Sequence, residues 1–208
     1  MAASASGRKV NDTLLTIQSR HSIRNFISDR EIAASDIQAI LSAANQAPSA
    51  HNQQSWRFIV LREAKKNELA HLISGRAADF PRPSCTLLRM ACRSITSAAV
   101  VVAVVNTGEL IRRGPRLFAA EQKEVRDFFR IMEIQSSAAA VENMLLAATS
   151  LGIGSVWLGI LILLKDAVLD FLGEPQGEFM AVVPLGYSLH ESSSPKKRPL
   201  EAFVKYIS

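Results

Sequence analysis

Residues 98–105 read AAVVVAVV, an uninterrupted apolar run in which five of the eight residues are valine. Valine is β-branched and favours extended backbone, and a run without polar alternation is typical of a strand buried on both faces. Two further runs, WRFIVL at 56–61 and FMAVVPLG at 179–186, have the length and composition of core strands. The sequence therefore predicts one small sheet with residues 98–105 in its interior.

Helical patterns surround these three runs. A short helix is expected from Asn11 to Gln18, and Ser35 is expected to cap a second helix that continues through Gln46. The second helix has one apolar face, formed by Ile37, Ile40 and Leu41. Further helices are expected at 63–74, from about 121 to 150, and at 165–172. Helices on both sides of one small sheet predict an α+β, three-layer architecture.

Three stretches are less regular. Residues 76–96 contain Pro81 and Pro83, which interrupt the pattern, and a loop carrying Gly108, Gly114 and Pro115 follows the valine run. Residues 155–158 fit either a short strand or an extended turn. These stretches join the expected elements without a recognisable linker between domains.

Length and composition predict a single globular domain. The chain has 208 residues, 48% hydrophobic and 21% charged, and shows neither an internal repeat nor a low-complexity segment. We expect residues 1–10 to be a flexible tail and residues 11–208 to form one domain. The two cysteines, Cys85 and Cys92, lack the spacing of a metal site and are expected to be reduced, buried thiols. Reduced thiols fit a cytoplasmic protein.

Charge and hydropathy argue against two other classes of protein. Residues 1–100 hold 13 Lys and Arg against 7 Asp and Glu, a formal charge of +6, but aromatic residues do not interleave with the basic ones as in many nucleic-acid binders. Residues 144–164 carry no charge over 21 positions, which is long enough to cross a bilayer, but Gly152, Gly154 and Gly159 interrupt them. We therefore expect neither nucleic acid nor a membrane as partner.

Two segments before the first strand could carry chemistry. Residues 20–24 read RHSIR, and if they are extended, Arg20, Ser22 and Arg24 lie on one side, where two guanidinium groups and a hydroxyl could bind an oxyanion. Residues 47–56, APSAHNQQSW, form a polar loop between a helix and a strand. Taken singly, the first segment could equally be a solvated basic loop and the second an ordinary surface loop.

Two later segments add to these. Residues 151–160 read LGIGSVWLGI, and their glycines would allow backbone to approach a flat ligand closely, although a buried turn with a core tryptophan fits equally well. This segment follows a helix instead of a strand, which argues against a dinucleotide fingerprint. Near the C-terminus, KKR at 196–198 is a basic cluster of the kind that is usually solvated.

In this order and spacing, the four segments resemble the nitroreductase superfamily of flavoproteins over roughly residues 12–75 and 137–205. The marks are RHSIRNF, APSAHNQQSWRFIV, LGIGSVWLGI, and VVPLGY followed by KKRPLEAF. The resemblance implies a three-layer α/β/α sandwich with a small, mostly antiparallel central sheet. It also implies a homodimer with exchanged C-terminal segments and two FMN sites at the subunit interface.

The resemblance assigns a role to each matching position. Arg20, His21 and Ser22 match positions that hold the FMN phosphate and ribityl chain, and Arg24 matches the basic residue beside the flavin pyrimidine edge. The loop that the second subunit lays on the cofactor corresponds to Pro48, Ser49, Ala50 and Asn52. The backbone run facing the central flavin ring, where an amide donates to N5, corresponds to Trp157, Leu158 and Gly159. The C-terminal phosphate contacts correspond to Arg198 and Lys196.

Two residues depart from the family pattern. Ser55 stands where a proline commonly precedes the tryptophan, and His51 is unusual in the polar loop. The first change affects the stiffness of the loop, and the second could affect access to the pocket. Neither removes a cofactor contact.

The implied activity is an FMN-dependent transfer of hydride from NADH or NADPH to a small aromatic or quinone-type acceptor, by a ping-pong mechanism. Such chemistry needs neither a catalytic acid or base nor a metal, and none is assigned. Acceptor specificity is expected from residues 76–96 and 107–130. Alternatives are a flavin-binding sensor or store without turnover, a specialised activity such as reductive dehalogenation, and a basic protein that binds nucleic acid through residues 1–100.

Overall fold

The fold, seen in a computed structural model that describes residues 11–117, 123–191 and 193–207, is built on one central sheet. Its strands are β1 (Trp56–Leu61), β2 (Val100–Asn106), β3 (Gly154–Ser155) and β4 (Glu178–Gly186). They lie side by side in the order β1-β2-β4-β3, and all three pairings are antiparallel. The three predicted core strands are confirmed, with β2 in the interior of the sheet.

Strand β2 is buried along its whole length, as the valine run predicts. Its side chains alternate between two hydrophobic clusters. Val101, Ala103 and Val105 belong to the cluster on one face of the sheet, whereas Val100, Val102 and Val104 belong to the cluster on the other. From Val100 to Val105 the strand fills both cores and has no position for a polar side chain, which explains the absence of alternation in this part of the sequence.

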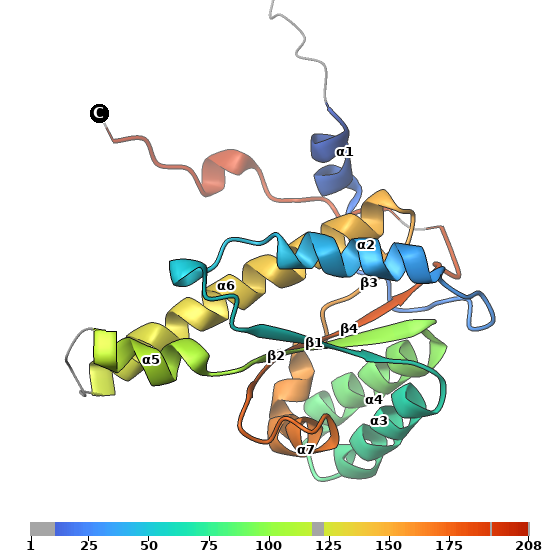
Figure 1. The fold of residues 1–208 in the computed structure, drawn as a ribbon. Helices are drawn as coiled ribbons and strands as arrows, with labels where there is room; N and C mark the ends of the chain where they lie inside the picture. The colour runs from blue at the N-terminus through green and yellow to red at the C-terminus, as the bar shows by residue number, and fades with distance from the viewer. Residues whose placement is uncertain (1–10, 118–122, 192, 208) are drawn as a thin grey trace, which may run out of the picture.

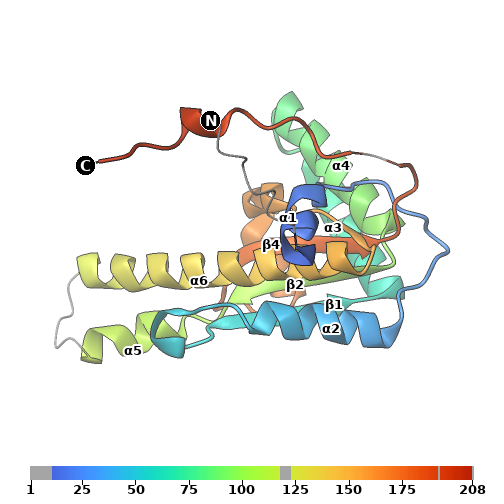
Figure 2. The same ribbon diagram turned by 90° about the horizontal axis from the view of Figure 1, so that it is seen from above.

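Helices cover both faces of the sheet (Figure 1). Helices α2 (Ala34–Asn45) and α6 (Lys123–Ser150) lie side by side on one face, as Figure 2 also shows. Helices α3 (Glu63–Ala77), α4 (Arg82–Ser97) and α7 (Lys165–Phe171) cover the other face, with the 3-10 helix η2 (Gly159–Leu164). The predicted α+β, three-layer architecture is therefore confirmed.

One predicted helix start is wrong, and one stretch without a predicted structure proves to be helical. Helix α2 begins at Ala34 after Ala33, without a side-chain cap, so Ser35 lies inside its first turn and does not cap it. Residues 76–96, which looked irregular because of Pro81 and Pro83, contain most of α4. Pro81 is the residue before this helix and Pro83 lies in its first turn, where the missing N–H has no intrahelical partner to lose. The prolines therefore start a helix instead of breaking one.

The loop predicted around Gly114 and Pro115 is also wrong, because residues 109–117 form helix α5 (Glu109–Leu117). This helix packs on α6, and Gly114 is the contact point. A Cβ atom at Gly114 would overlap the ring of Phe129, which is fully buried between the two helices. The glycine, which suggested a loop by composition, allows two helices to approach closely.

We expect Gly114→Ala to destabilise the protein because the added methyl group has no space beside Phe129. Overpacking of this kind costs about 1–3 kcal/mol, which for a chain of this size lowers the melting temperature by roughly 2–12 °C. Thermal unfolding followed by circular dichroism measures the change. Gly75→Ala in α3 is the matched control, since its Cβ would meet nothing within 4 Å and alanine favours helix. Equal melting temperatures for the two variants would contradict the packing argument.

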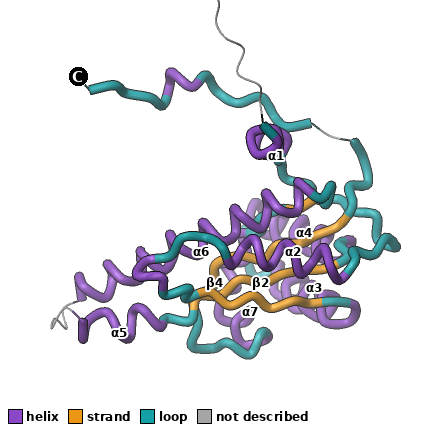
Figure 3. The backbone as a smooth tube through the Cα atoms, turned by 45° about the horizontal axis from the view of Figure 1, so that its top comes forward, coloured by secondary structure: helices purple, strands orange, loops and turns teal. Residues whose placement is uncertain are grey.

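Two segments stand out from the body of the fold (Figure 3). Helix α1 (Asp12–Ser19) is capped by the Asn11 side chain and buries none of its residues. The segment after β4 runs away from the sheet, and a short 3-10 helix, η3 (Leu200–Ala202), is the one helical turn in its described residues, 187–191 and 193–207. Several large apolar side chains in these two segments are exposed: Leu14, Leu15, Ile17, Leu200, Phe203, Tyr206 and Ile207.

The uncharged stretch 144–164 is divided among the end of α6, strand β3 and η2. Across the described ranges, none of the helices is both long and apolar enough to cross a bilayer. Cys85 and Cys92 are unpaired, as expected, but both are half-buried, because they lie on the partly exposed flank of α4. The predictions of a tail at 1–10 and of a helix start at Glu121 fall outside the described residues.

Candidate functional site

Residues 20–24 run along the free edge of β3. Ser22 forms a parallel bridge with Ser155, and the Ile23 N–H donates to the Ser155 carbonyl over 2.9 Å. Gly154 allows this approach, because a Cβ there would lie 3.0 Å from Ile23 side-chain atoms and 3.1 Å from the Gly186 carbonyl oxygen. The segment is thus extended, as the alternation argument assumed, and successive side chains point to opposite sides.

Arg24 lies on one of these sides, at a small pocket of about 160 Å³. The backbone run 157–159, which the resemblance implies would face a flavin ring, lines the same pocket. Helix α4 closes it with Leu87 and Met90, both of which remain exposed. The structure therefore brings together Arg24 and the run Trp157–Gly159, which are separated by more than 130 positions in the sequence.

The amides of the 157–159 run are not equivalent. The Leu158 N–H already donates to the Val182 carbonyl of β4 over 2.9 Å, so it holds the run against the sheet. A ligand at this pocket would therefore have to take its backbone hydrogen bond from Trp157 or Gly159. The sequence resemblance alone does not show which of the three amides, at residues 157, 158 and 159, is free to donate to a ligand.

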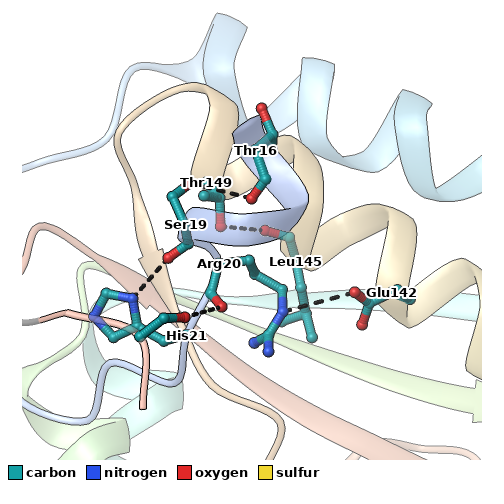
Figure 4. A network of polar contacts seen from close by, with 8 residues as sticks. Thr16, Ser19, Arg20, His21, Glu142, Leu145 and Thr149 are labelled. Carbon is teal, nitrogen blue, oxygen red and sulfur yellow. Dashed lines mark hydrogen bonds and ion pairs between the residues drawn. The ribbon is translucent and has the colours of Figure 1, made fainter. Parts of the chain in front are cut away.

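Arg20 follows α1 and points towards α6 (Figure 4). Its Nε atom lies 3.7 Å from Glu142 Oε1, and its carbonyl oxygen accepts a hydrogen bond from Ser194 Oγ over 3.0 Å. Both side chains of the ion pair are partly exposed, at 22% and 50%, so the pair contributes about 0–1 kcal/mol. The guanidinium group is thus held loosely, beside the point where the C-terminal segment passes.

His21 points to the opposite side of the segment from Arg24. Its Nδ1 lies 2.8 Å from the Ser19 carbonyl oxygen, which requires the proton on Nδ1 (Figure 4). The ring lines a separate pocket of about 470 Å³ together with Ile23, Ser188 and His190. The imidazole and the Arg24 guanidinium therefore do not share a pocket in one chain.

The polar loop lies elsewhere on the same chain. It contains the 3-10 helix η1 (Ala50–Asn52), and the Ala50 N–H donates over 3.1 Å to Ser136 Oγ in the middle of α6. His51 and Asn52 both have a φ of 52°, a left-handed conformation that is uncommon for residues other than glycine. Pro48 is exposed, and Ser49 Oγ accepts from the Gln54 N–H. The four loop residues predicted to contact the cofactor do not line the pocket at Arg24: Pro48, Ser49, Ala50 and Asn52.

The C-terminal basic cluster is exposed. Lys196 and Arg198 lie on the segment that runs away from the sheet, and the Arg198 guanidinium sits over the Phe203 ring at 4.3 Å from its centre. In one chain, the structure therefore brings together two of the four predicted segments, leaves the loop against α6, and leaves the basic cluster in solvent. Within the described ranges, no group of His, Cys, Asp and Glu could hold a metal ion.

Sequence reasoning missed three residues at the site. Leu87 and Met90 form the α4 wall of the pocket, and Glu142 is the partner of Arg20. The signal for the first two was present, because they lie three positions apart, on a different side of α4 from the buried Leu88 and Ile95. Glu142 gave no such signal, since its position depends on how α1 meets α6.

Comparison with known proteins gives a family. Residues 17–187 match the model of the Nitroreductase family. A candidate NADH dehydrogenase/NAD(P)H nitroreductase from Archaeoglobus fulgidus is 37% identical over 185 residues, which is 88% of each chain. A Thermus thermophilus protein named NADH dehydrogenase is 29% identical over 202 residues, covering 89% of this chain and 91% of its own.

Solved structures agree with this family. A candidate nitroreductase from Desulfovibrio desulfuricans, solved in complex with FMN, is 26% identical, covers 96% of this chain and 99% of its own, and superimposes with a TM-score of 0.70. NfrA2 from Bacillus megaterium shares the fold with a TM-score of 0.74 at 20% identity, covering 96% of this chain and 75% of its own. Because the family match extends from the last turn of α1 to the residue after β4, the protein is a member of the nitroreductase family.

Proposed function

We propose that the protein is a homodimeric FMN-dependent oxidoreductase that takes hydride from NADH or NADPH and passes it to a small aromatic or quinone-type acceptor. The observation that carries this proposal is the pocket at which Arg24 lies beside Trp157, Leu158 and Gly159. A cation beside an apolar wall with backbone amides suits a flat ring that gains negative charge on reduction. The relatives named as NAD(P)H nitroreductases and the FMN-bound neighbour support the same reading.

The residues present fit FMN. Arg24 would lie beside the pyrimidine edge of the ring, and the Trp157 or Gly159 amide would donate to it, since the Leu158 amide is bonded to Val182. Arg20, with Ser22 on the same side of the segment, would bind the phosphate, because the loose pair with Glu142 can be exchanged for a phosphate oxygen. Bound FMN would supply the hydride-accepting chemistry, while the protein positions it and sets the local charge.

Two observations support a homodimer in which each site uses both chains. The pocket of about 160 Å³ is smaller than the roughly 300–1,000 Å³ of typical ligand sites. The remaining predicted contacts, at 48–52 and 196–198, lie away from it in the same chain. A second copy could bring both segments to the pocket, and α1, which buries none of its residues, offers apolar side chains to such a copy.

The test begins with purification without added cofactor. A yellow protein whose released cofactor is FMN, and whose visible absorbance bleaches on anaerobic mixing with NADH or NADPH, supports the proposal. Recovery of the absorbance on adding a quinone or nitroaromatic, with parallel lines in double-reciprocal plots, supports alternate use of one pocket by donor and acceptor. Flavin that never bleaches would instead indicate a binding protein without turnover, and a colourless protein that gains no FMN would contradict the proposal.

A further inference from the structure

A buried polar cluster lies where the sheet meets α5 and α6, outside the pocket at Arg24. Its members are Ser55, Asn106, Glu133 and Ser137, all with at most 3% of their surface exposed. The Ser137 hydroxyl donates to Asn106 Oδ1, which joins α6 to the end of β2. A carboxylate buried in such a place is costly unless it has partners, so the contacts of Glu133 require an explanation.

Glu133 caps a helix from a distance. Its Oε1 atom accepts the N–H of Leu110, the second residue of α5, over 2.7 Å, and only 1% of its surface is exposed. Helix N-termini carry N–H groups without intrahelical partners and a partial positive charge, and a carboxylate satisfies both. In this chain, the carboxylate comes from α6, 23 positions away, so that α5 is held on α6 at its beginning as well as at Gly114.

The other side of Glu133 faces the end of the polar loop. The Ser55 hydroxyl lies near this carboxylate, yet Ser55 Oγ and Glu133 Oε2 are both buried without completing a hydrogen bond. The Ser55 carbonyl accepts the Thr107 N–H over 2.8 Å, directly before α5. One carboxylate therefore stands between the residue that ends loop 47–55 and the residues that begin α5.

The surroundings of Glu133 shift the pKa of its carboxyl group in opposite directions. Burial raises the pKa of its carboxyl group, whereas the amides of Leu110 and Ile111 and the Ser55 hydroxyl lower it. The Glu178 carboxylate of β4 raises the pKa further, although Arg130 of α6 forms an ion pair with Glu178. The net effect is a raised pKa of Glu133. The closed arrangement, in which Glu133 is buried against the start of α5, therefore binds the proton more tightly than an arrangement in which Glu133 is exposed to water.

We propose that Glu133 is a positioning residue, whose buried carboxyl group fixes the start of α5 against the end of loop 47–55 through the Oε1 atom, an acceptor that is present in both protonation states. These two segments would then keep one arrangement relative to each other during turnover. The effect on acceptor binding rests on the function proposed above, which places the loop over a cofactor and assigns acceptor specificity in part to residues 107–130. The effect on α5 itself does not depend on that function.

The first test uses Glu133→Ala and Glu133→Gln. Alanine removes the acceptor for the Leu110 N–H, whereas glutamine keeps an amide oxygen there without the charge. We expect amide hydrogen exchange at Leu110 and Ile111 to be at least tenfold faster in Glu133→Ala and no faster in Glu133→Gln, with α3 amides unchanged as the control. Unchanged exchange in the alanine variant, or equal acceleration in both variants, would overturn the proposal.

Kinetics separate positioning from a general loss of structure. In Glu133→Ala we expect a several-fold rise in KM for the acceptor, while flavin content and the rate of bleaching by NADH stay within twofold. Glutamine should restore the acceptor KM. If flavin is bound and reduced normally but the acceptor KM does not change, the positioning role in turnover is wrong although the proposed function stands. If the wild-type protein itself binds no flavin, the proposed function fails, and the exchange measurement still decides the role of Glu133.

The pH dependence gives a second test, which remains available if Glu133→Ala does not fold. Because the closed arrangement has the higher pKa, protection of the α5 amides should be greatest below the usual range of a glutamate and decrease as the pH rises through the raised pKa. Glu133→Gln should show no such decrease. Identical pH profiles for the wild type and Glu133→Gln would overturn the proposal.

Discussion

Replacing Arg20 with alanine is expected to weaken FMN binding by roughly 10- to 150-fold, because a charge-assisted hydrogen bond to a phosphate contributes about 1.5–3 kcal/mol. The folded protein itself should lose little stability, since the pair with Glu142 is loose and partly exposed. Fluorescence titration of the apoprotein with FMN measures the dissociation constant. Titration with riboflavin, which lacks the phosphate, should show almost no difference between wild type and Arg20→Ala.

Two control variants make the test of Arg20 specific. Arg76→Ala removes an exposed arginine that pairs with Asp79 at the end of α3, and FMN affinity should not change. Glu142→Gln removes the counter-charge of Arg20 and should leave FMN affinity unchanged or slightly higher. The phosphate assignment is contradicted if Arg20→Ala binds FMN as tightly as these two variants.

Removing residues 195–208 is expected to have the largest effect of any change, dissociating the proposed dimer and abolishing cofactor retention. Leu200, Phe203, Tyr206 and Ile207 are between 59% and 91% exposed in one chain. Burying an apolar side chain of this size contributes about 1.5–3 kcal/mol, from which the cost of ordering the segment is subtracted. A net loss of about 4 kcal/mol weakens association by about 1,000-fold. Sedimentation velocity at micromolar concentration measures this change.

The charges of the C-terminal segment can be separated from its apolar side chains. The double variant Lys196→Ala, Arg198→Ala keeps the apolar side chains and should remain dimeric while binding FMN more weakly. A truncated protein that still sediments as a dimer would show that the C-terminal segment is not exchanged. Truncated and full-length proteins that are both monomeric and both retain FMN would contradict the two-chain site altogether.

The layers of this fold could be read from the sequence because they follow from local rules. A valine run without polar positions has few structural options other than a strand with a core on each side, and both cores are present. The extended conformation of residues 20–24 and the alternation of their side chains were predictable for the same reason. The order of four short motifs was sufficient to predict the family that the match over residues 17–187 shows.

Local rules failed where a distant part of the chain decides the outcome. Gly114 and Pro115 have the composition of a loop, yet residues 109–117 are helical, since Phe129 packs against the glycine and Glu133 caps the first turn. The amide of Leu158 is taken by Val182, which no pattern around residues 157–159 indicates.

The sequence by itself determined the sheet, its two covering layers and the segments proposed to carry the site, because side-chain periodicity and backbone preference act over a few residues. Only the tertiary structure decided which of those segments meet in one chain. Arg24 reaches Trp157 because residues 20–24 pair with the edge of β3, whereas loop 48–52 is held on α6 by Ser136. Each of these contacts joins residues that are more than 80 positions apart in the sequence. The residues around either partner do not indicate which distant segment will pack against them.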